Sequence, residues 1–356
     1  MIRNKESDIM LKVGIAGIGF MGMIHYLSYQ KIRGAKVVAI CEQDQNRLTG
    51  DWRDIKGNFG PAGTIMDLKG VDTYSQIDDM LADEQIDAID ITLPPSLHAD
   101  IAVKALRAGK HVFCEKPMAL VPADCRRMVA AAEKADRQIL VGHVLPFFPE
   151  YNWALKTIRS GRYGKLLGGN FKRVIADPSW LANYWQADKV GGPLLDLHIH
   201  DAHFICLLFG MPLTVSTTGR TRSELAEYWH SQFAYGPKGP VVQATSGTIP
   251  QQGRQFLHGF EIHLEKATLL FEFAVIGDKA EYLCPPTLLS QKGKVDYISL
   301  AGEDPTHAFD AEIREVVRCL SRGETSNILN AQLAQDAILL CQKQAESLSK
   351  GRAVKV

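Results

Sequence analysis

The sequence predicts an α/β protein of two domains. The first is an amino-terminal doubly wound parallel sheet, and the second is a carboxyl-terminal α+β domain with a large, mostly antiparallel open sheet. The chain has 356 residues, which suits two domains of about 150 to 200 residues. Short apolar strands alternate with helices over residues 10–145, and longer β-branched or alternating segments follow over 146–356. We therefore place the domain boundary between residues 145 and 146.

Strands and helices alternate along the first domain, as a parallel sheet with right-handed crossovers requires. A Gly-rich, irregular stretch over 57–70 interrupts the pattern. The expected strands are 11–16, 37–42, 86–94, 111–117 and 138–144, and the expected helices are 17–32, 75–83, 96–109 and 122–135.

The second domain shows long segments of strand character and few helices. Its one early helix follows Gly191-Gly192-Pro193, and a short linker runs from Pro146 to Pro149. The expected strands include 166–176, 241–249 and 256–273, ending with 297–300, and two closing helices cover 308–323 and 331–351. The last helix could pack back on the first domain.

Composition excludes several classes of protein. Forty basic residues balance forty acidic ones, so the chain lacks the positive field of a nucleic-acid-binding protein and the polybasic patch of a membrane-surface protein. We find no apolar run of membrane-spanning length and no secretory leader in the first ten residues. The seven cysteines form no CxxC pair, which favours a reducing compartment, and we expect a cytoplasmic protein.

A glycine motif follows the first strand. Gly17, Gly19 and Gly22 fit GxGxxG, with Phe20 and Met21 between the last two. The three glycines permit a tight turn, the approach of a pyrophosphate to the backbone, and close packing of helix on strand. Since the helix begins inside the motif, its free N–H groups would face the phosphates. The pattern predicts a dinucleotide site in a Rossmann domain.

The residue after the second strand bears on the choice of cofactor. Glu42 follows Gly17 by 25 residues, close to the position of the acidic residue that binds the adenosine ribose hydroxyls. A carboxylate there repels a 2′-phosphate, so we expect NAD in preference to NADP. Arg47 is close enough in sequence to serve NADP instead.

Three segments resemble the glucose–fructose oxidoreductase / inositol dehydrogenase / MocA-like family. They are GIGFMG, TLPPSLHADIAVKALRAGKHVFCEKPMAL and GGPLLDLHIHD, and the resemblance covers nearly the whole chain. It implies a nicotinamide cofactor on the first domain, and a second domain that binds substrate and often forms the oligomer interface. A homodimer or homotetramer through the exposed face of the second sheet is expected on this ground.

The resemblance also implies site residues. Lys116, Asp196 and His200 correspond to the family's catalytic group, and His98 to a position near the nicotinamide. The expected cofactor-binding residues are Gly17, Gly19, Phe20, Met21, Gly22, Glu42, Arg47, Thr92, Pro94, His98, Glu115 and Lys116. Two alternatives stay open: His98 could have only a local structural role, and Lys116 could be a solvated surface lysine.

The histidine-rich segment suits proton transfer. Asp196, His200 and His203 are spaced i, i+4 and i+7, which on an α-helix places Asp196 and His200 roughly 40° apart and all three within roughly 60°, with His198 on the other side. Asp196 could orient the imidazole of His200, which would take a hydroxyl proton. A metal site would need a fourth ligand, which we do not find. The remaining alternative is that these residues form a polar cluster at a domain interface without a catalytic role.

Other positions bear on the substrate. The family commonly has Gly at position 198 and Asp at 203, where this chain has histidines, and Arg where it has Pro146. His203, Trp180, Tyr184 and Trp185 are expected substrate contacts, although aromatic residues in such a loop more often serve packing.

These observations predict an NAD(P)-dependent oxidoreductase for the hydroxyl or keto carbon of a sugar, sugar derivative or cyclitol. One alternative is a dinucleotide-sensing regulator without turnover. Another is an enzyme that oxidises a sugar transiently, with no net redox change.

Overall fold

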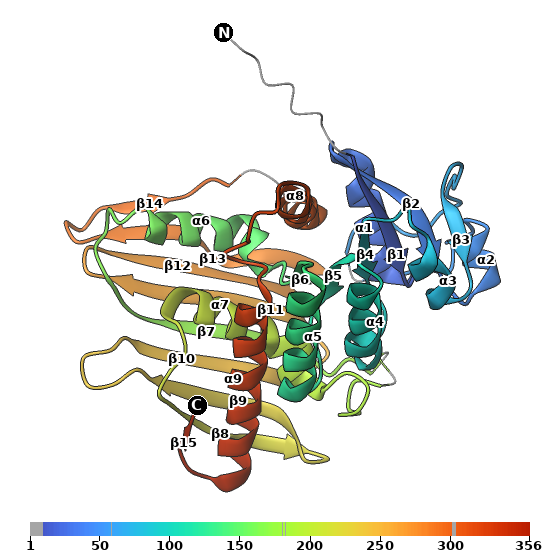
Figure 1. The fold of residues 1–356 in the computed structure, drawn as a ribbon. Helices are drawn as coiled ribbons and strands as arrows, with labels where there is room; N and C mark the ends of the chain where they lie inside the picture. Colours follow the sequence, from blue (N-terminus) through green and yellow to red (C-terminus); the bar gives the residue numbers. More distant parts are fainter. Residues whose placement is uncertain (1–9, 58, 180, 182, 301–303) are drawn as a thin grey trace. The chain divides into compact units, whose positions relative to one another are not determined.

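The computed structural model describes residues 10–57, 59–179, 181, 183–300 and 304–356. It divides into two compact units (Figure 1). Of the described residues, the first unit comprises those within 10–119, 123–144 and 304–332, and the second comprises those within 120–122, 145–300 and 333–356. The segment 304–332 thus belongs to the first unit, whereas the sequence-based division places all of 146–356 in the second domain.

The first unit is built on a parallel sheet of six strands in the order β3-β2-β1-β4-β5-β6. The order reverses between β1 and β4, which pair directly, and open α/β sheets bind ligands at such a switch point. This architecture confirms the expected doubly wound sheet. The strands are β1 Leu11–Ala16, β2 Ala35–Cys41, β3 Asp72–Tyr74, β4 Ala88–Ile91, β5 His111–Glu115 and β6 Ile139–Gly142.

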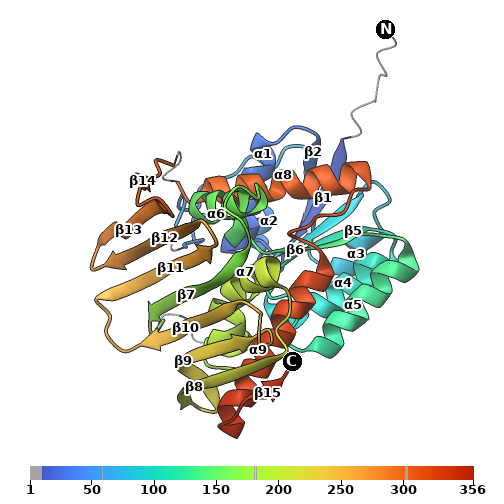
Figure 2. The same ribbon diagram turned by 90° about the vertical axis from the view of Figure 1, so that its left-hand side faces the viewer.

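Helices cover both faces of this sheet. Helix α1 packs against α8 and α3 packs against α4, with the strands between the two pairs (Figure 2). The apolar strands are buried from both sides, as parallel sheets are. The helices of this unit are α1 Phe20–Lys31, α2 Gln45–Leu48, α3 Ile77–Ala82, α4 Pro95–Arg107, α5 Pro122–Ala135 and α8 Thr306–Arg322.

The second unit contains a sheet of nine strands in the order β14-β13-β12-β11-β7-β10-β9-β8-β15. Its pairs are antiparallel except for β7 with β10, which confirms the expected mostly antiparallel sheet. The strands are β7 Leu166–Ala176, β8 Thr214–Arg222, β9 Leu225–Ala234, β10 Val241–Ile249, β11 Arg254–Leu264, β12 Ala267–Ile276, β13 Lys279–Ser290, β14 Val295–Tyr297 and β15 Val354–Lys355.

Helices pack on one face of this sheet and leave the other face open (Figure 2). Tyr151 of α6, for example, is fully buried against the rings of Phe260 and Phe271. The helical segments are a 3-10 turn Leu145–Phe147, α6 Pro149–Arg159, a π-helical turn Leu194–His198, α7 Ile199–Phe209 and α9 Ala331–Lys350. Within the described ranges, no helix is both long and apolar enough to cross a membrane.

Several elements of the second unit differ from the expectation. The final strand before α8 is β14, which ends at Tyr297, whereas the sequence predicted a strand over 297–300. Strands β8, β9 and β13 and helix α6 were not anticipated. Strand β8, TVSTTGRTR, is rich in polar residues, and its last five residues are exposed on both faces of the strand. Such a strand lacks the apolar signal by which strands are found.

A buried ion pair joins the sheet to helix α7. Arg173 of β7 donates from Nε to Asp201 Oδ2 at 2.6 Å and from Nη2 to Oδ1 at 3.2 Å. Arg173 is 4% exposed and Asp201 is fully buried. Charges at this depth are tolerated only when they are paired with good geometry. The pair therefore holds the first turn of α7 against the middle of the sheet.

Replacing one partner of this pair should destabilise the second unit. In Asp201→Asn the Arg173 guanidinium stays buried without a counter-charge, and we expect the free energy of unfolding to fall by about 3–5 kcal/mol. Urea denaturation followed by circular dichroism measures this. Lys279→Ala, which removes an exposed ion pair with Glu281, is the control and should leave the midpoint unchanged. An Asp201→Asn midpoint equal to the control's would contradict the assignment.

Candidate active site

The glycine turn lies between β1 and the start of α1. Gly17 has φ +95°, a conformation that favours glycine. A Cβ at Gly22 would overlap the Gly17 carbonyl oxygen, so α1 can approach the end of β1 this closely only with glycine there. The Gly17 oxygen also accepts a hydrogen bond of 2.6 Å from the Thr92 hydroxyl, just beyond β4. The switch point of the sheet is thereby tied together.

The middle glycine leaves the backbone open. No heavy atom lies within 4 Å of the position that a Cβ at Gly19 would take, and helix α1 begins at the next residue. The N–H groups of a helix's first turn have no intrahelical partner and attract anions. These features fit the pyrophosphate of a dinucleotide.

Phe20 and Met21 form the first turn of α1 and are half-buried. The Phe20 ring packs edge-on against Phe59 at 4.9 Å between centroids, and a Cβ at Gly57 would overlap that ring. The irregular stretch after α2 therefore folds back over the glycine turn.

Glu42 directly follows β2, and its carboxylate faces the glycine turn. Its Oε2 accepts the Ile18 N–H at 2.8 Å, and its Oε1 accepts the Gln43 N–H at 2.7 Å. Arg47 donates to the Ile18 carbonyl oxygen at 3.1 Å and to Asp54 at 2.6 Å, and its Nη1 lies 3.8 Å from the Glu42 carboxylate. Both residues that bear on the choice of cofactor are thus at the turn, and Arg47 is already paired with acidic groups.

His98, in the first half of α4, bridges two backbone segments. Its Nδ1 lies 2.8 Å from the Pro117 carbonyl oxygen and its Nε2 lies 2.8 Å from the Leu93 carbonyl oxygen. These contacts link the ends of β4 and β5 and support the local structural role that the sequence left open. Pro94 precedes α4 as its N-cap residue.

Lys116 follows β5 at the same carboxyl edge of the sheet. It is half-buried, and its peptide bond to Pro117 is cis. Its backbone N–H donates to its neighbour Glu115 at Oε2, at 2.9 Å. The edge of this one sheet therefore brings together Gly17–Gly22, Glu42, Thr92 and Lys116.

A buried ionic cluster beneath this edge was not predicted. His25 Nδ1 lies 2.9 Å from Asp90 Oδ2, and His25 Nε2 lies 3.2 Å from Glu115 Oε1. Glu312 of α8 is fully buried nearby, and neither of its carboxylate oxygens has a hydrogen-bond partner among the described residues. Burial and then the charges of Glu115 and Asp90 raise the pKa of Glu312 well above its usual range. The sequence feature that could have indicated this cluster is Asp90, an acidic residue inside the otherwise apolar strand AIDI.

In the second unit, Asp196 and His200 lie on successive helical turns. Asp196 is in the π-helical turn and His200 is in the first turn of α7, and both are half-buried. A π-turn closes on the fifth residue rather than the fourth, so the offset of about 40° expected for an α-helix does not hold between them. π-turns occur frequently at functional sites.

The two additional histidines are both fully buried. His198 Nδ1 lies 2.8 Å from the Ser246 hydroxyl, and its Nε2 lies 3.0 Å from Gln344 Nε2. Burial lowers the pKa of His198 to about 4, so the ring is neutral and serves the core. His203 lies one turn after His200 on α7.

The aromatic loop before these helices is held by its own contacts. Trp185 donates from Nε1 to Asp177 at 3.0 Å, and the Arg222 guanidinium lies 4.5 Å above its ring while also pairing with Asp177. Tyr184 is 2% exposed. These contacts support the packing interpretation of both residues, and Trp180 lies outside the described residues.

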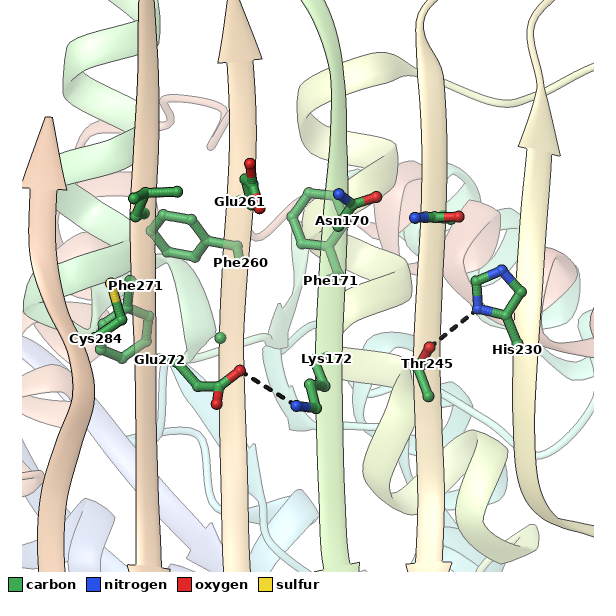
Figure 3. Close-up of a pocket in the computed structure, with 13 residues that line it drawn as sticks. Asn170, Phe171, Lys172, His230, Thr245, Phe260, Glu261, Phe271, Glu272 and Cys284 are labelled. Carbon is green, nitrogen blue, oxygen red and sulfur yellow. Dashed lines mark hydrogen bonds and ion pairs between the residues drawn. The ribbon is translucent and has the colours of Figure 1, made fainter. Parts of the chain in front are cut away.

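The open face of the second sheet carries a shallow hollow of about 380 Å³. Figure 3 shows polar side chains along it: Lys172 bonds Glu272 at 3.3 Å, and His230 lies 3.0 Å from the Thr245 hydroxyl. This face is opposite to Arg173 and α7, so the hollow does not include the histidine-rich helix.

Two family models match the chain. Residues 11–143 match an oxidoreductase family with an NAD-binding Rossmann fold, and residues 151–270 match the GFO/IDH/MocA C-terminal domain. Together they cover more than half of the chain.

Curated relatives and solved structures agree with these matches. An uncharacterized oxidoreductase of Streptococcus pneumoniae is 29% identical over 67% of this chain and 68% of its own length. Inositol 2-dehydrogenase of Salmonella typhimurium is 34% identical over 44% of each chain, so the chain spans less than half the length of that relative. Levoglucosan dehydrogenase in complex with NADH has the same fold, with a TM-score of 0.79 at 21% identity over 97% of this chain and 99% of its own.

Two glycine substitutions should separate folding from dinucleotide binding. Gly22→Ala forces α1 away from Gly17, so we expect a loss of about 1–3 kcal/mol in the free energy of unfolding. Gly19→Ala places a methyl group in open space, so stability should hold while NADH affinity falls. Thermal unfolding and fluorescence titration measure the two effects. Equal NADH affinity of Gly19→Ala and wild type would contradict the assigned pyrophosphate position.

The buried carboxyl of Glu312 predicts a pH dependence. Because its pKa is raised in the folded state, the native protein retains a proton that the unfolded chain releases, and stability falls as pH rises above about 4.5. Glu312→Gln removes this loss, so we expect it to raise the free energy of unfolding by about 1–2 kcal/mol at about pH 8 and by little at about pH 5. Urea titrations at both pH values check this. A gain of equal size at both would contradict the raised pKa.

Proposed function

We propose, since the chain belongs to the Gfo/Idh/MocA oxidoreductase family, that it transfers hydride between a nicotinamide dinucleotide and a carbinol or keto carbon of a sugar, sugar derivative or cyclitol. The observation that carries the proposal is the convergence of the glycine turn, Glu42 and Lys116 on the carboxyl edge of one parallel sheet. Open α/β folds bind dinucleotides at that edge. The names of relatives, an inositol 2-dehydrogenase and a levoglucosan dehydrogenase, support a polyhydroxylated substrate.

The proposed cofactor is NAD rather than NADP. The Glu42 carboxylate faces the glycine turn, where it can accept hydrogen bonds from ribose hydroxyls and would repel a 2′-phosphate. Arg47, the residue that could attract that phosphate, is bonded to Asp54 at 2.6 Å. Its charge is therefore already balanced by acidic neighbours.

The proposed chemical roles follow from the types of side chain. A bound nicotinamide ring supplies the hydride acceptor or donor. The Lys116 ammonium donates to the substrate oxygen and stabilises negative charge that develops there. His200 takes the hydroxyl proton during oxidation and returns it during reduction, and Asp196 stabilises the resulting imidazolium. His203 is proposed as a substrate contact beside His200.

A titration with both dinucleotides tests the cofactor assignment. Wild-type protein should bind NADH more tightly than NADPH, and Glu42→Ala should weaken NADH binding about tenfold, which corresponds to about 1.4 kcal/mol. The matched control is Gln43→Ala, whose side chain is the exposed neighbour of Glu42. Tighter binding of NADPH than of NADH by the wild type, or an unchanged preference in Glu42→Ala, would indicate that Arg47 rather than Glu42 determines the choice of cofactor. A protein that binds neither dinucleotide would overturn the proposal.

Turnover tests the roles of Lys116 and His200. With a polyol that yields NADH in the presence of the wild type, Lys116→Ala and His200→Ala should each lower kcat by about 10²–10⁴-fold. His200→Ala should bind NADH like the wild type, because His200 is not among the cofactor-binding residues. Lys116→Ala should still bind NADH, although less tightly, because the glycine turn and Glu42 are unchanged. The measurement is NADH absorbance at saturating substrate. Full activity in either variant would remove that residue from the proposed mechanism.

A further inference from the structure

His25 is clamped between carboxylates from two neighbouring strands. It lies in the second turn of α1, and its two ring nitrogens contact Asp90 of β4 and Glu115 of β5 at 2.9 and 3.2 Å. Both His25 and Asp90 are fully buried, and Glu115 is 6% exposed. A neutral imidazole has one N–H, whereas an imidazolium has two. Only the charged ring can donate to both carboxylates.

Aromatic rings hold the plane of this imidazole. The Phe113 ring is stacked on it with 5.3 Å between centroids and 19° between planes. The Phe309 ring lies 6.4 Å away and is tilted by 44°. Stacking on an aromatic face favours a cation and fixes its orientation. His25 is therefore a rigid group between a helix and two strands.

Glu115 connects His25 to the backbone of Lys116. One carboxylate oxygen of Glu115 contacts His25, and the other accepts the Lys116 N–H at 2.9 Å. Strand β6 also leaves little room around this carboxylate, because a Cβ at Gly142 would lie 3.3 Å from Glu115 Oε1. The orientation of Glu115 thus depends on His25, and the backbone of Lys116 depends on Glu115.

The charged groups around His25 make its proton the balancing charge of the cluster. Asp90 and Glu115 contact it from β4 and β5, and the Tyr29 hydroxyl also hydrogen-bonds Asp90. Glu312 of α8 faces the same cluster, but its raised pKa favours the neutral carboxyl. Burial alone would lower the pKa of His25, but Asp90 and Glu115 overcome that effect and raise it well above its usual range. Loss of this proton leaves buried carboxylates uncompensated, which is costly.

We propose that His25 is a positioning residue for Lys116. As an imidazolium bonded to Asp90 and Glu115, it fixes the carboxylate that sets the backbone of Lys116 at the dinucleotide edge of the sheet. The inference rests on the proposed function, because it assigns to Lys116 a place beside the bound dinucleotide. It predicts that alkaline pH loosens this edge by removing one buried proton, before the fold itself is lost.

Two measurements on the full-length protein test this. Nitrogen-15 NMR of histidine-labelled wild type, with His25→Gln to assign the signal, reports the charge of the His25 ring. We expect imidazolium shifts for both nitrogens at about pH 8, where an ordinary histidine is neutral. NADH titrations across pH then measure how tightly the dinucleotide edge of the sheet binds the cofactor. They compare the wild type with His25→Gln, Asp90→Asn and Glu115→Gln.

The variants have distinct expected outcomes. His25→Gln should weaken NADH binding about tenfold to a hundredfold. Asp90→Asn should move the alkaline loss of NADH affinity to lower pH, because it removes a charge that holds the proton. Glu115→Gln keeps an acceptor for the Lys116 N–H without a charge and should abolish the pH dependence. The matched control is His111→Gln, at the amino end of the same strand, which should bind NADH like the wild type.

Each contrary result is informative. A neutral His25 ring at about pH 8 would overturn the inference without touching the proposed function, and so would unchanged NADH affinity and pH profile in folded His25→Gln. If His25→Gln does not fold, the Asp90→Asn variant decides: an alkaline loss of NADH affinity at the same pH as in the wild type would overturn the inference. A wild type that binds neither NADH nor NADPH would overturn the proposed function, and the inference with it.

Discussion

The close approach of helix α1 to strand β1 is the constraint on which the first unit depends. It is possible because residue 22 has no Cβ to collide with the Gly17 carbonyl oxygen. The approach aims the start of α1 at the edge of the sheet and seats His25, one turn later, over the neighbouring strands. Backbone N–H groups for phosphate and a buried cation for two carboxylates thus come from one short helix. Both the close packing of α1 on β1 and the ionic contacts of His25 therefore depend on Gly22.

The second unit uses buried polar contacts to fix its histidine-rich helix. Arg173 pairs with Asp201 on one side of His200, and His198 reaches Ser246 and Gln344 on the other. Both anchors belong to the sheet or to α9, so the turn that carries His200 cannot slide without breaking a buried bond. Such networks are costly when incomplete and rigid when satisfied. A group proposed to move protons gains a fixed position from them.

Much of this architecture could be predicted from the sequence. The parallel sheet, the glycine turn and Glu42 follow from local patterns, because each depends on an apolar strand of recognisable length. Lys116 was expected from the family resemblance of its segment. Strand β8 was not predicted because consecutive polar residues, exposed on both of its faces, leave no apolar alternation. The His25 cluster was not predicted because Asp90 and Glu115 follow His25 by 65 and 90 residues in the chain, and the three residues meet only through the strand order. The π-turn before α7 was not predicted because, over only five residues, the spacing of its apolar residues does not differ clearly from that of an α-helix.

A crystal structure of the protein with NAD⁺ tests the central claim most directly. The account predicts the pyrophosphate within hydrogen-bond distance of backbone N–H groups at the start of α1, ribose hydroxyls on the Glu42 carboxylate, and the nicotinamide ring beside Lys116. It also predicts that His25, Asp90 and Glu115 keep their contacts in the complex. A dinucleotide bound away from the Gly17–Gly22 turn, or with its nicotinamide ring directed away from Lys116, would contradict it.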